Sequence, residues 1–157
     1  MGNKTKDGNK EMSQQTIPCA NSCICLPMCI NKSMHDIFDC CKLLSSHWYK
    51  WVGHPQVHRK LAMKRGYNLV SQMNKILKRT FIPYIYHERI KTSGKTINKE
   101  VRIFADALEV QHMPAKDLFY TIREYDKIGI NLFADKYVGE IIIRAFDHHY
   151  SKEATNE

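Results

Sequence analysis

Acidic side chains are nearly absent from the middle of this sequence. Residues 50–102 hold 13 lysines and arginines against only Glu88 and Glu100, whereas residues 1–49 and 103–157 carry net charges of +1 and −4. The formal net charge of +8 therefore comes from one segment, whose own charge is +11. A field of that sign attracts polyanions, either nucleic-acid phosphates or acidic lipid headgroups.

The sequence also lacks an apolar run long enough to cross a bilayer. Its most apolar stretch, residues 17–30, is too short for that and is interrupted by Pro18 and Pro27. It is a poor secretory signal, because no strongly basic leader precedes it and no clear small-residue cleavage pattern follows. We therefore expect a protein that is not secreted, whose cysteines are mostly reduced.

Residues 1–15 contain no aromatic and no β-branched apolar residue, so they can bury almost nothing. The remainder, in a chain of 157 residues that is 43% hydrophobic and 25% charged, fits one globular domain. We predict a disordered tail over 1–16, a cysteine-rich apolar segment over 17–45, a single α+β domain over 46–150 and a polar tail over 151–157.

Enzyme motifs are missing as well. His54 and His58 have the spacing of a metalloprotease pair, but no Glu follows His54. Residues 93–96 resemble the end of a phosphate-binding P-loop, but Arg89 stands where its first glycine belongs. No nucleophile elbow and no paired catalytic carboxylates are found. We predict a protein that is not an enzyme and has no catalytic residues, although a Cys nucleophile assisted by His stays open.

A strongly amphipathic helix is predicted between Pro55 and Arg79, with Pro83 shortly beyond its end. At about 100° per residue, apolar residues such as Leu69 and Met73 fall on one side. Six cations fall on the opposite side and are our candidate residues for binding a membrane or another anion: Lys60, Lys64, Arg65, Lys75, Lys78 and Arg79. No acidic residue lies among them to form i,i+4 pairs. The alternative is a core-packed helix whose charged face is merely solvated.

All six cysteines fall in one short stretch, at Cys19, Cys23, Cys25, Cys29, Cys40 and Cys41. Three interpretations stay open. The first four could bind zinc, in two pairs with three-residue spacers. All six are candidates for acylation near a membrane, and Gly2 is a candidate for myristoylation that would need such a second anchor. Free cysteines that pack as small hydrophobes are the third possibility, and in that case no cofactor is expected.

Aromatic residues crowd next to the basic helix, in residues 47–51 (His-Trp-Tyr-Lys-Trp). They could anchor the protein at a membrane interface or form a stacking surface for bases. Two tryptophans this close are also ordinary core residues, and we expect one of them to be buried.

Beyond the helix, the periodicity indicates a β-hairpin. Residues 81–90 and 100–110 are rich in β-branched and aromatic side chains, and residues 92–95 between them indicate a turn. A helix opened by Pro114 is predicted over 114–127, followed by a final strand over 137–146. The expected fold class is α+β, with a small antiparallel sheet packed by two or more helices and a flexible N-terminal tail.

Residues 101–146 are similar in layout to part of the matrix proteins of rhabdoviruses. The similarity consists of a strand, a proline-opened helix and a closing strand, with the two peptides Glu124-Tyr125-Asp126-Lys127-Ile128-Gly129 and Ile141-Ile142-Ile143-Arg144-Ala145-Phe146. The resemblance covers less than a third of the chain. It implies a small basic structural protein of the virion that lies beneath the envelope, binds acidic lipid, self-associates and contacts the nucleocapsid.

Our leading hypothesis is a non-enzymatic peripheral membrane protein of the viral-matrix kind at the cytoplasmic face of membranes. Its anchors would be the basic helix and the region from Gly2 to Cys41. The opposite charges of the middle and the C-terminal third also predict head-to-tail self-association into a homo-oligomer. The alternative is a zinc-stabilised RNA-binding protein that uses the same lysines on phosphates.

Overall fold

The computed structural model describes residues 26–155, with side chains described over 28–151. The fold is α+β as predicted, with a two-stranded antiparallel sheet packed by helices. The predicted tail over 1–16 lies outside the described residues. The chain divides into two compact units, Met1–Arg79 and Thr80–Glu157. This division falls inside residues 46–150, for which a single domain stays a prediction.

The first unit is helical over its described residues. It contains α2 (Leu26–Cys29), α3 (Met34–Cys40), α4 (Lys42–Trp48), the π-helical turn η2 (Tyr49–Gly53) and the long helix α5 (Arg59–Leu77). Side chains cap the N-termini of α3, α4 and α5. At α3, Ser33 Oγ accepts a hydrogen bond from the Asp36 N–H at 3.1 Å. Apolar residues from α3, α4, η2 and α5 form the core: Met34, Ile37, Leu44, Val52, Ala62, Met63, Leu69, Val70, Met73 and Leu77.

Helix α5 confirms the amphipathic helix predicted from the sequence. It begins at His58, whose Nδ1 accepts a hydrogen bond from the Leu61 N–H at 3.3 Å, and it ends at Lys78, which has a left-handed backbone with φ 54°. Its predicted apolar side is buried, apart from a half-buried Ile76. The basic side therefore faces away from the core of its unit.

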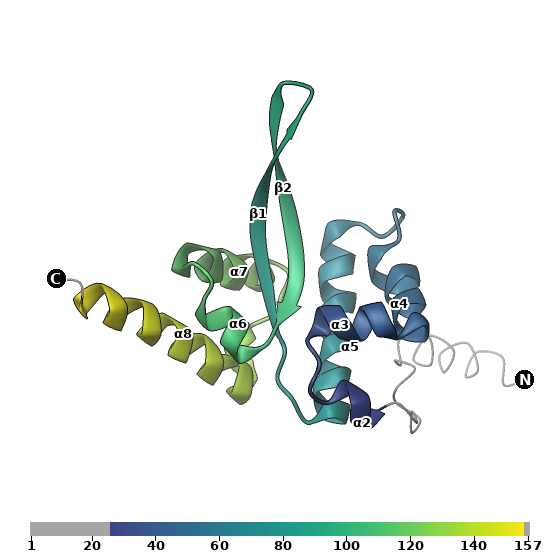
Figure 1. Ribbon diagram of the computed structural model, residues 1–157, viewed down its shortest axis with the longest axis horizontal. Helices are drawn as coiled ribbons and strands as arrows, with labels where there is room; N and C mark the ends of the chain where they lie inside the picture. The colour runs from purple at the N-terminus through teal and green to yellow at the C-terminus, as the bar shows by residue number, and fades with distance from the viewer. Residues whose placement is uncertain (1–25, 156–157) are drawn as a thin grey trace, which may run out of the picture. The chain divides into compact units, whose positions relative to one another are not determined.

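The second unit begins with the predicted hairpin. Strands β1 (Ile82–Thr92) and β2 (Lys95–Ala105) pair in register from Ile82↔Ala105 to Thr92↔Lys95. Ser93 and Gly94 form the connecting turn with positive φ angles of 50° and 76°, as tight hairpin turns of two residues require. The ribbon is long, and its distal part extends beyond the helices of its own unit (Figure 1).

The second strand ends five residues earlier than predicted, so the prediction of strand over 106–110 is wrong. Asp106 instead begins the short helix α6 (Ala107–Gln111) through a capping box. Its Oδ1 accepts a hydrogen bond from the Glu109 N–H at 2.9 Å, and Glu109 Oε1 accepts one from the Asp106 N–H at 3.3 Å. These two reciprocal hydrogen bonds satisfy the N–H groups of Asp106 and Glu109, which stand at the start of the helix, where N–H groups have no main-chain acceptor within the helix.

Helix α7 (Ala115–Lys127) confirms the helix predicted after Pro114, and it packs along β1. Its C-cap, Ile128, is followed by Gly129, whose φ of 86° favours glycine. A short 3-10 turn, η3 (Leu132–Ala134), then leads to the last helix, α8 (Lys136–Thr155). The core of this unit includes Tyr84 and Ile85 from β1, Leu118 and Tyr125 from α7, and Ile142 from α8.

The prediction of a final strand over 137–146 is wrong, because these residues belong to α8. Asp135 caps this helix through Oδ1, which accepts hydrogen bonds from the N–H groups of Tyr137 (2.9 Å) and Val138 (3.1 Å). The buried positions Val138, Ile142 and Ala145 follow helical spacing and pack in a unit where α8 contacts α6, α7 and η3. Helical burial of this stripe outweighs the strand propensity of three consecutive isoleucines.

Candidate functional site

Four of the six predicted anion-binding residues remain available on α5. Lys60, Lys75 and Lys78 are exposed and Lys64 is half-buried. None of the four forms an ion pair with any residue that the structure describes. We call these four residues the α5 lysine row. Spacings of four and eleven residues keep Lys60, Lys64 and Lys75 on one side of the helix, and Lys60 and Lys75 are about 22 Å apart along its axis. Lys78 is the C-terminal cap of the same helix.

Arg65 is instead engaged by the aromatic cluster. Its guanidinium donates a hydrogen bond to the Trp51 carbonyl at 3.1 Å and lies 5.0 Å from the centroid of the Trp51 ring. The Nζ of Lys50 lies 5.7 Å from the same centroid. A cation over an indole face gains electrostatic attraction to the ring quadrupole. Arg65 therefore joins η2 to α5, and Trp51 is a packing residue flanked by two cations.

Arg79 also has a structural partner. Its guanidinium donates a hydrogen bond to the carbonyl of Lys32, in the connection between α2 and α3. This contact joins the end of α5 to the start of the described chain within the first unit. The sequence pattern placed Arg65 and Arg79 with the lysines, but the structure gives both of them contacts with main-chain carbonyls.

The two tryptophans occupy similar environments. Trp48 packs on Phe38, with ring centroids 4.9 Å apart, and both Trp48 and Trp51 are half-buried. Tyr49 between them is exposed, at 58% of its surface. The prediction that one tryptophan is a buried core residue is therefore wrong, because neither of them belongs to the buried core of the described residues.

Exposed apolar side chains lie in the same unit as the lysine row. Leu43 on α4 is 71% exposed and Met28 on α2 is 66% exposed. Lys42 and Lys50, which flank Leu43 and Tyr49 along the chain, are also exposed. Apolar and cationic side chains in alternation are typical of surfaces that lie at a lipid–water interface.

Three of the six cysteines, Cys29, Cys40 and Cys41, lie within the described residues, and none of the three forms a disulfide bond. Cys41 begins α4, with its Sγ accepting a hydrogen bond from the Leu44 N–H at 3.4 Å. Cys40 is exposed and accepts a hydrogen bond from Lys32 Nζ at 3.2 Å, which raises the pKa of Lys32. Of the described cysteines, Cys40 is therefore the one most accessible to acylation. Gly2, Cys19, Cys23 and Cys25 lie outside the described residues.

The part of the chain that the structure describes contains neither a group of side chains that could hold a metal ion nor a helix that could span a membrane. No three His, Cys, Asp or Glu side chains there are grouped so that they could hold a metal ion. The zinc alternative depends on Cys19, Cys23 and Cys25 together with Cys29, so it stays a prediction. No helix among the described residues combines the length and hydrophobicity needed to cross a bilayer.

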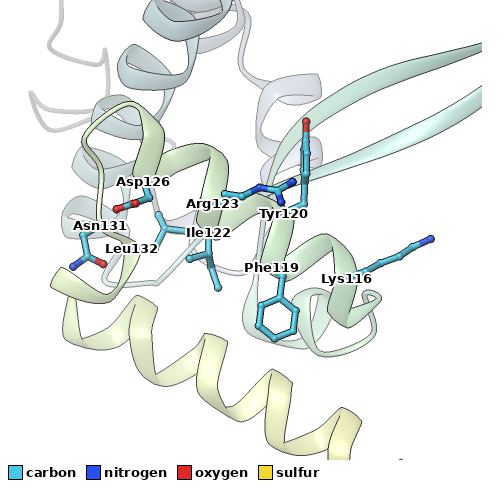
Figure 2. Close-up of a pocket in the computed structure, with 8 residues that line it drawn as sticks. All are labelled: Lys116, Phe119, Tyr120, Ile122, Arg123, Asp126, Asn131 and Leu132. Atoms are coloured by element: carbon cyan, nitrogen blue, oxygen red, sulfur yellow. The ribbon is translucent and has the colours of Figure 1, made fainter.

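A groove in the second unit runs along α7 and has a volume of about 710 Å³. Figure 2 shows Phe119 pointing toward α8, where its ring lies 4.5 Å from that of Phe146. The lining residues are Lys116, Phe119, Tyr120, Ile122, Arg123, Asp126, Asn131 and Leu132. They include no Cys, His or Ser, so the groove offers no nucleophile paired with a histidine base.

The distal hairpin carries cations that the sequence analysis left out of its candidate site. Arg89, Lys91, Lys95 and Lys99 are all exposed, and none forms an ion pair within the described residues. They belong to the same basic segment, 50–102, that was recognised from composition. Their charge is visible in the composition of that segment, but helical periodicity does not select residues on a strand.

No protein-family model matches this chain, and comparison with curated proteins and with solved structures gives no match either. The resemblance to rhabdovirus matrix proteins therefore stays a prediction. One element of the layout behind it differs in the structure, since residues 141–146 are helical rather than extended.

Proposed function

We propose that this chain is a non-enzymatic peripheral membrane protein whose first unit binds anionic lipid. The observation that carries the proposal is the α5 lysine row: three cations on one side of a core-packed helix and a fourth at its C-terminal cap, without ion pairs among the described residues. Cations along one side of a rigid helix are complementary to an anionic surface.

The burial of α5 defines how such a contact would work. Its apolar face forms the core of the unit, so this helix cannot insert that face into a bilayer as a free amphipathic peptide does. The lysines would instead reach the headgroups and act electrostatically. Each Lys or Arg near an anionic surface contributes about 1 kcal/mol, so four of them would contribute about 4 kcal/mol.

Exposed apolar residues favour lipid over other anions as the partner of this unit. Leu43, Tyr49 and Met28 are more than half exposed, and Lys42 and Lys50 lie beside the first two in sequence. Such side chains can enter the headgroup region while neighbouring lysines stay at its surface. A nucleic-acid backbone offers no comparable apolar layer.

The resemblance to rhabdovirus matrix proteins adds two further elements to this proposal: self-association, and a location beneath a viral envelope. The opposite net charges of residues 50–102 and 103–157 are compatible with contacts between copies. Acylation at Gly2 or at the cysteines would add a second anchor, because one weak anchor alone holds a protein only marginally on a membrane.

Co-sedimentation with vesicles tests the proposal. The wild-type protein should bind vesicles of phosphatidylcholine with 30% phosphatidylserine and release as salt rises, because exposed charges are screened beyond about 8 Å at physiological ionic strength. The quadruple variant Lys60→Gln/Lys64→Gln/Lys75→Gln/Lys78→Gln should bind up to about 1,000-fold more weakly, from about 1 kcal/mol per charge.

The matched control removes four charges elsewhere. The variant Arg89→Gln/Lys91→Gln/Lys95→Gln/Lys99→Gln has the same net charge as the α5 variant, but it keeps the lysine row. It should retain most of the vesicle binding. Equal loss in the two variants would show that only net charge matters and would contradict the proposal.

A further inference from the structure

The distal part of the β1–β2 ribbon, residues 87–99, is an arm with almost no buried surface. Every residue in it is exposed except the half-buried Ile90. The arm extends past the helices of the second unit (Figure 1) and contains the tight turn at Ser93 and Gly94. Because it adds nothing to the core of its unit, its sequence is free to serve a contact with another molecule.

The arm is basic, and its cations are not neutralised. Arg89, Lys91, Lys95 and Lys99 form no ion pair within the described residues. Its one carboxylate, Glu88, accepts a hydrogen bond from the Tyr86 hydroxyl at 3.2 Å. Just below the arm, Glu100 accepts one from the Tyr120 hydroxyl at 3.2 Å. The arm therefore presents a net charge of +3 to solvent.

The strand register separates the two faces of the arm. Arg89 and Lys91 share one face with their cross-strand partners Asn98 and Thr96. This face combines two cations with an amide and a hydroxyl, the groups that contact phosphates and base edges in protein–nucleic acid complexes. The opposite face holds Lys95 and Lys99, which lie across from Thr92 and Glu88. Between them is the cross-strand pair Ile90↔Ile97, which stabilises a ribbon that has no third strand within the described residues.

A membrane is the less suitable partner for this arm. The loop at its end is Thr92-Ser93-Gly94-Lys95, with Lys91 next to it, so insertion into lipid would bury two lysines. Insertion would also place the outward N–H and C=O groups of a two-stranded ribbon in hydrocarbon without partners. A two-stranded ribbon does fit a nucleic-acid groove, since the major groove of B-form DNA admits one.

We propose that the β1–β2 arm is a nucleic-acid-binding element, with the face of Arg89 and Lys91 directed at a phosphodiester backbone. This inference is independent of the lipid contact proposed for the first unit, because it rests on different residues in a different unit. The common chemistry is the phosphodiester. The experiment distinguishes three possible sources of that phosphodiester: single-stranded RNA, double-stranded RNA and double-stranded DNA.

Fluorescence anisotropy with end-labelled 25-nucleotide single strands and 25-base-pair duplexes, between 50 and 200 mM salt, tests this proposal. Each phosphate contact that is lost should weaken binding about five- to eightfold near 0.1 M salt and reduce the salt slope by about 0.7 to 0.9. The arm variant Arg89→Gln/Lys91→Gln/Lys95→Gln/Lys99→Gln should therefore bind the preferred probe at least about 25-fold more weakly near 0.1 M salt, for two or more lost contacts. The pair Arg89→Gln/Lys91→Gln should account for most of that loss.

The α5 variant with four Lys→Gln changes is the control of equal charge, and it should keep the affinity of the wild type within about threefold. The proposal fails if the two variants lose equal affinity, if neither loses any, or if the wild type binds none of the probes. It also fails if the arm variant loses binding to phosphatidylserine vesicles rather than to nucleic acid. Unchanged circular dichroism would show that the exposed substitutions leave the fold intact.

Discussion

The hydroxyl of Thr121 on α7 accepts a hydrogen bond from the backbone N–H of Ile85 on β1 at 2.8 Å. The same hydroxyl lies 2.8 Å from the Asp117 carbonyl, to which it donates. Thr121 is only 2% exposed. One side chain of α7 thus provides a hydrogen-bond acceptor for β1, in a sheet to which the described residues contribute two strands.

Replacing Thr121 by Val should lower the free energy of unfolding by about 1–3 kcal/mol. Valine keeps the shape but leaves the buried Ile85 N–H without its acceptor. Thr121→Ser keeps the hydroxyl and should lose less. Urea unfolding followed by circular dichroism measures both, and a Val variant as stable as the wild type would show that this hydrogen bond does not hold α7 on the hairpin.

Stability should decline at alkaline pH because of Tyr84. Burial raises the pKa of its phenol, and the hydrogen bond that its hydroxyl donates to Asp117 Oδ2 at 2.8 Å raises that pKa further. The unfolded chain releases this proton near pH 10, whereas the folded protein keeps it. The free energy of unfolding should therefore fall as the pH rises above about 10.

Comparison of the wild type with Tyr84→Phe isolates this effect. The variant should be less stable at pH 8, because it loses the hydrogen bond to Asp117. Above pH 10 the free energy of unfolding of the variant should fall less steeply with pH. The difference in slope corresponds to one proton, the one that the Tyr84 phenol releases on unfolding in the wild type. Parallel curves for the two proteins in alkaline urea titrations would show that Tyr84 ionises as easily in the folded as in the unfolded state.

The first unit should lose stability on mild acidification because of His47. Burial lowers the pKa of its imidazole, and the nearby Lys50 lowers it further. Its Nε2 is buried without a hydrogen-bond partner among the described residues. The unfolded chain takes up this proton near pH 6.5 while the folded protein resists it, so the free energy of unfolding should fall as the pH drops below about 6.5.

Two variants test the contribution of His47. His47→Gln should show a smaller loss of stability between pH 6.5 and 5 than the wild type. Lys50→Gln should show an intermediate loss, since it removes only the second cause of the shift. Thermal unfolding across this pH range measures all three proteins, and an unchanged acid response in His47→Gln would contradict the assignment.

Local periodicity was enough to predict the elements whose sequence and packing agree. In α5 the apolar residues repeat at helical spacing between clear boundaries, and the structure buries that same face. The hairpin was predicted because Ser93 and Gly94 separate two β-rich segments. In each case one short segment contains both the residues that favour the element and the residues that end it.

The last helix shows where this reasoning fails. Ile141, Ile142 and Ile143 favour a strand by composition, and a short apolar run fits either structure. The decision depends on Val138, Ile142 and Ala145 packing in the second unit, and on Gly139, where a Cβ would lie 3.4 Å from the Phe133 ring. None of these contacts is visible in the sequence of the segment itself.

The candidate site was predictable as a charged segment but not residue by residue. Arg65 and Arg79 share the basic face in sequence, yet they donate to the carbonyls of Trp51 and Lys32, 14 and 47 residues away. A pattern of charged side chains does not show which main-chain carbonyls will accept hydrogen bonds from them. The cations of the arm were missed because a helical wheel selects residues on helices and ignores an exposed ribbon.

We propose that the α5 lysine row binds lipid and that the β1–β2 arm binds nucleic acid. Vesicle recruitment of labelled nucleic acid is the measurement that tests both assignments most directly. Phosphatidylserine vesicles, protein and the preferred labelled strand are mixed and sedimented together. The wild type should carry the strand into the vesicle pellet. The α5 variant should leave both protein and strand in the supernatant, and the arm variant should sediment with the vesicles but without the strand. An arm variant that fails to reach the vesicles, or an α5 variant that still reaches them, would contradict the assignment of lipid binding to the first unit.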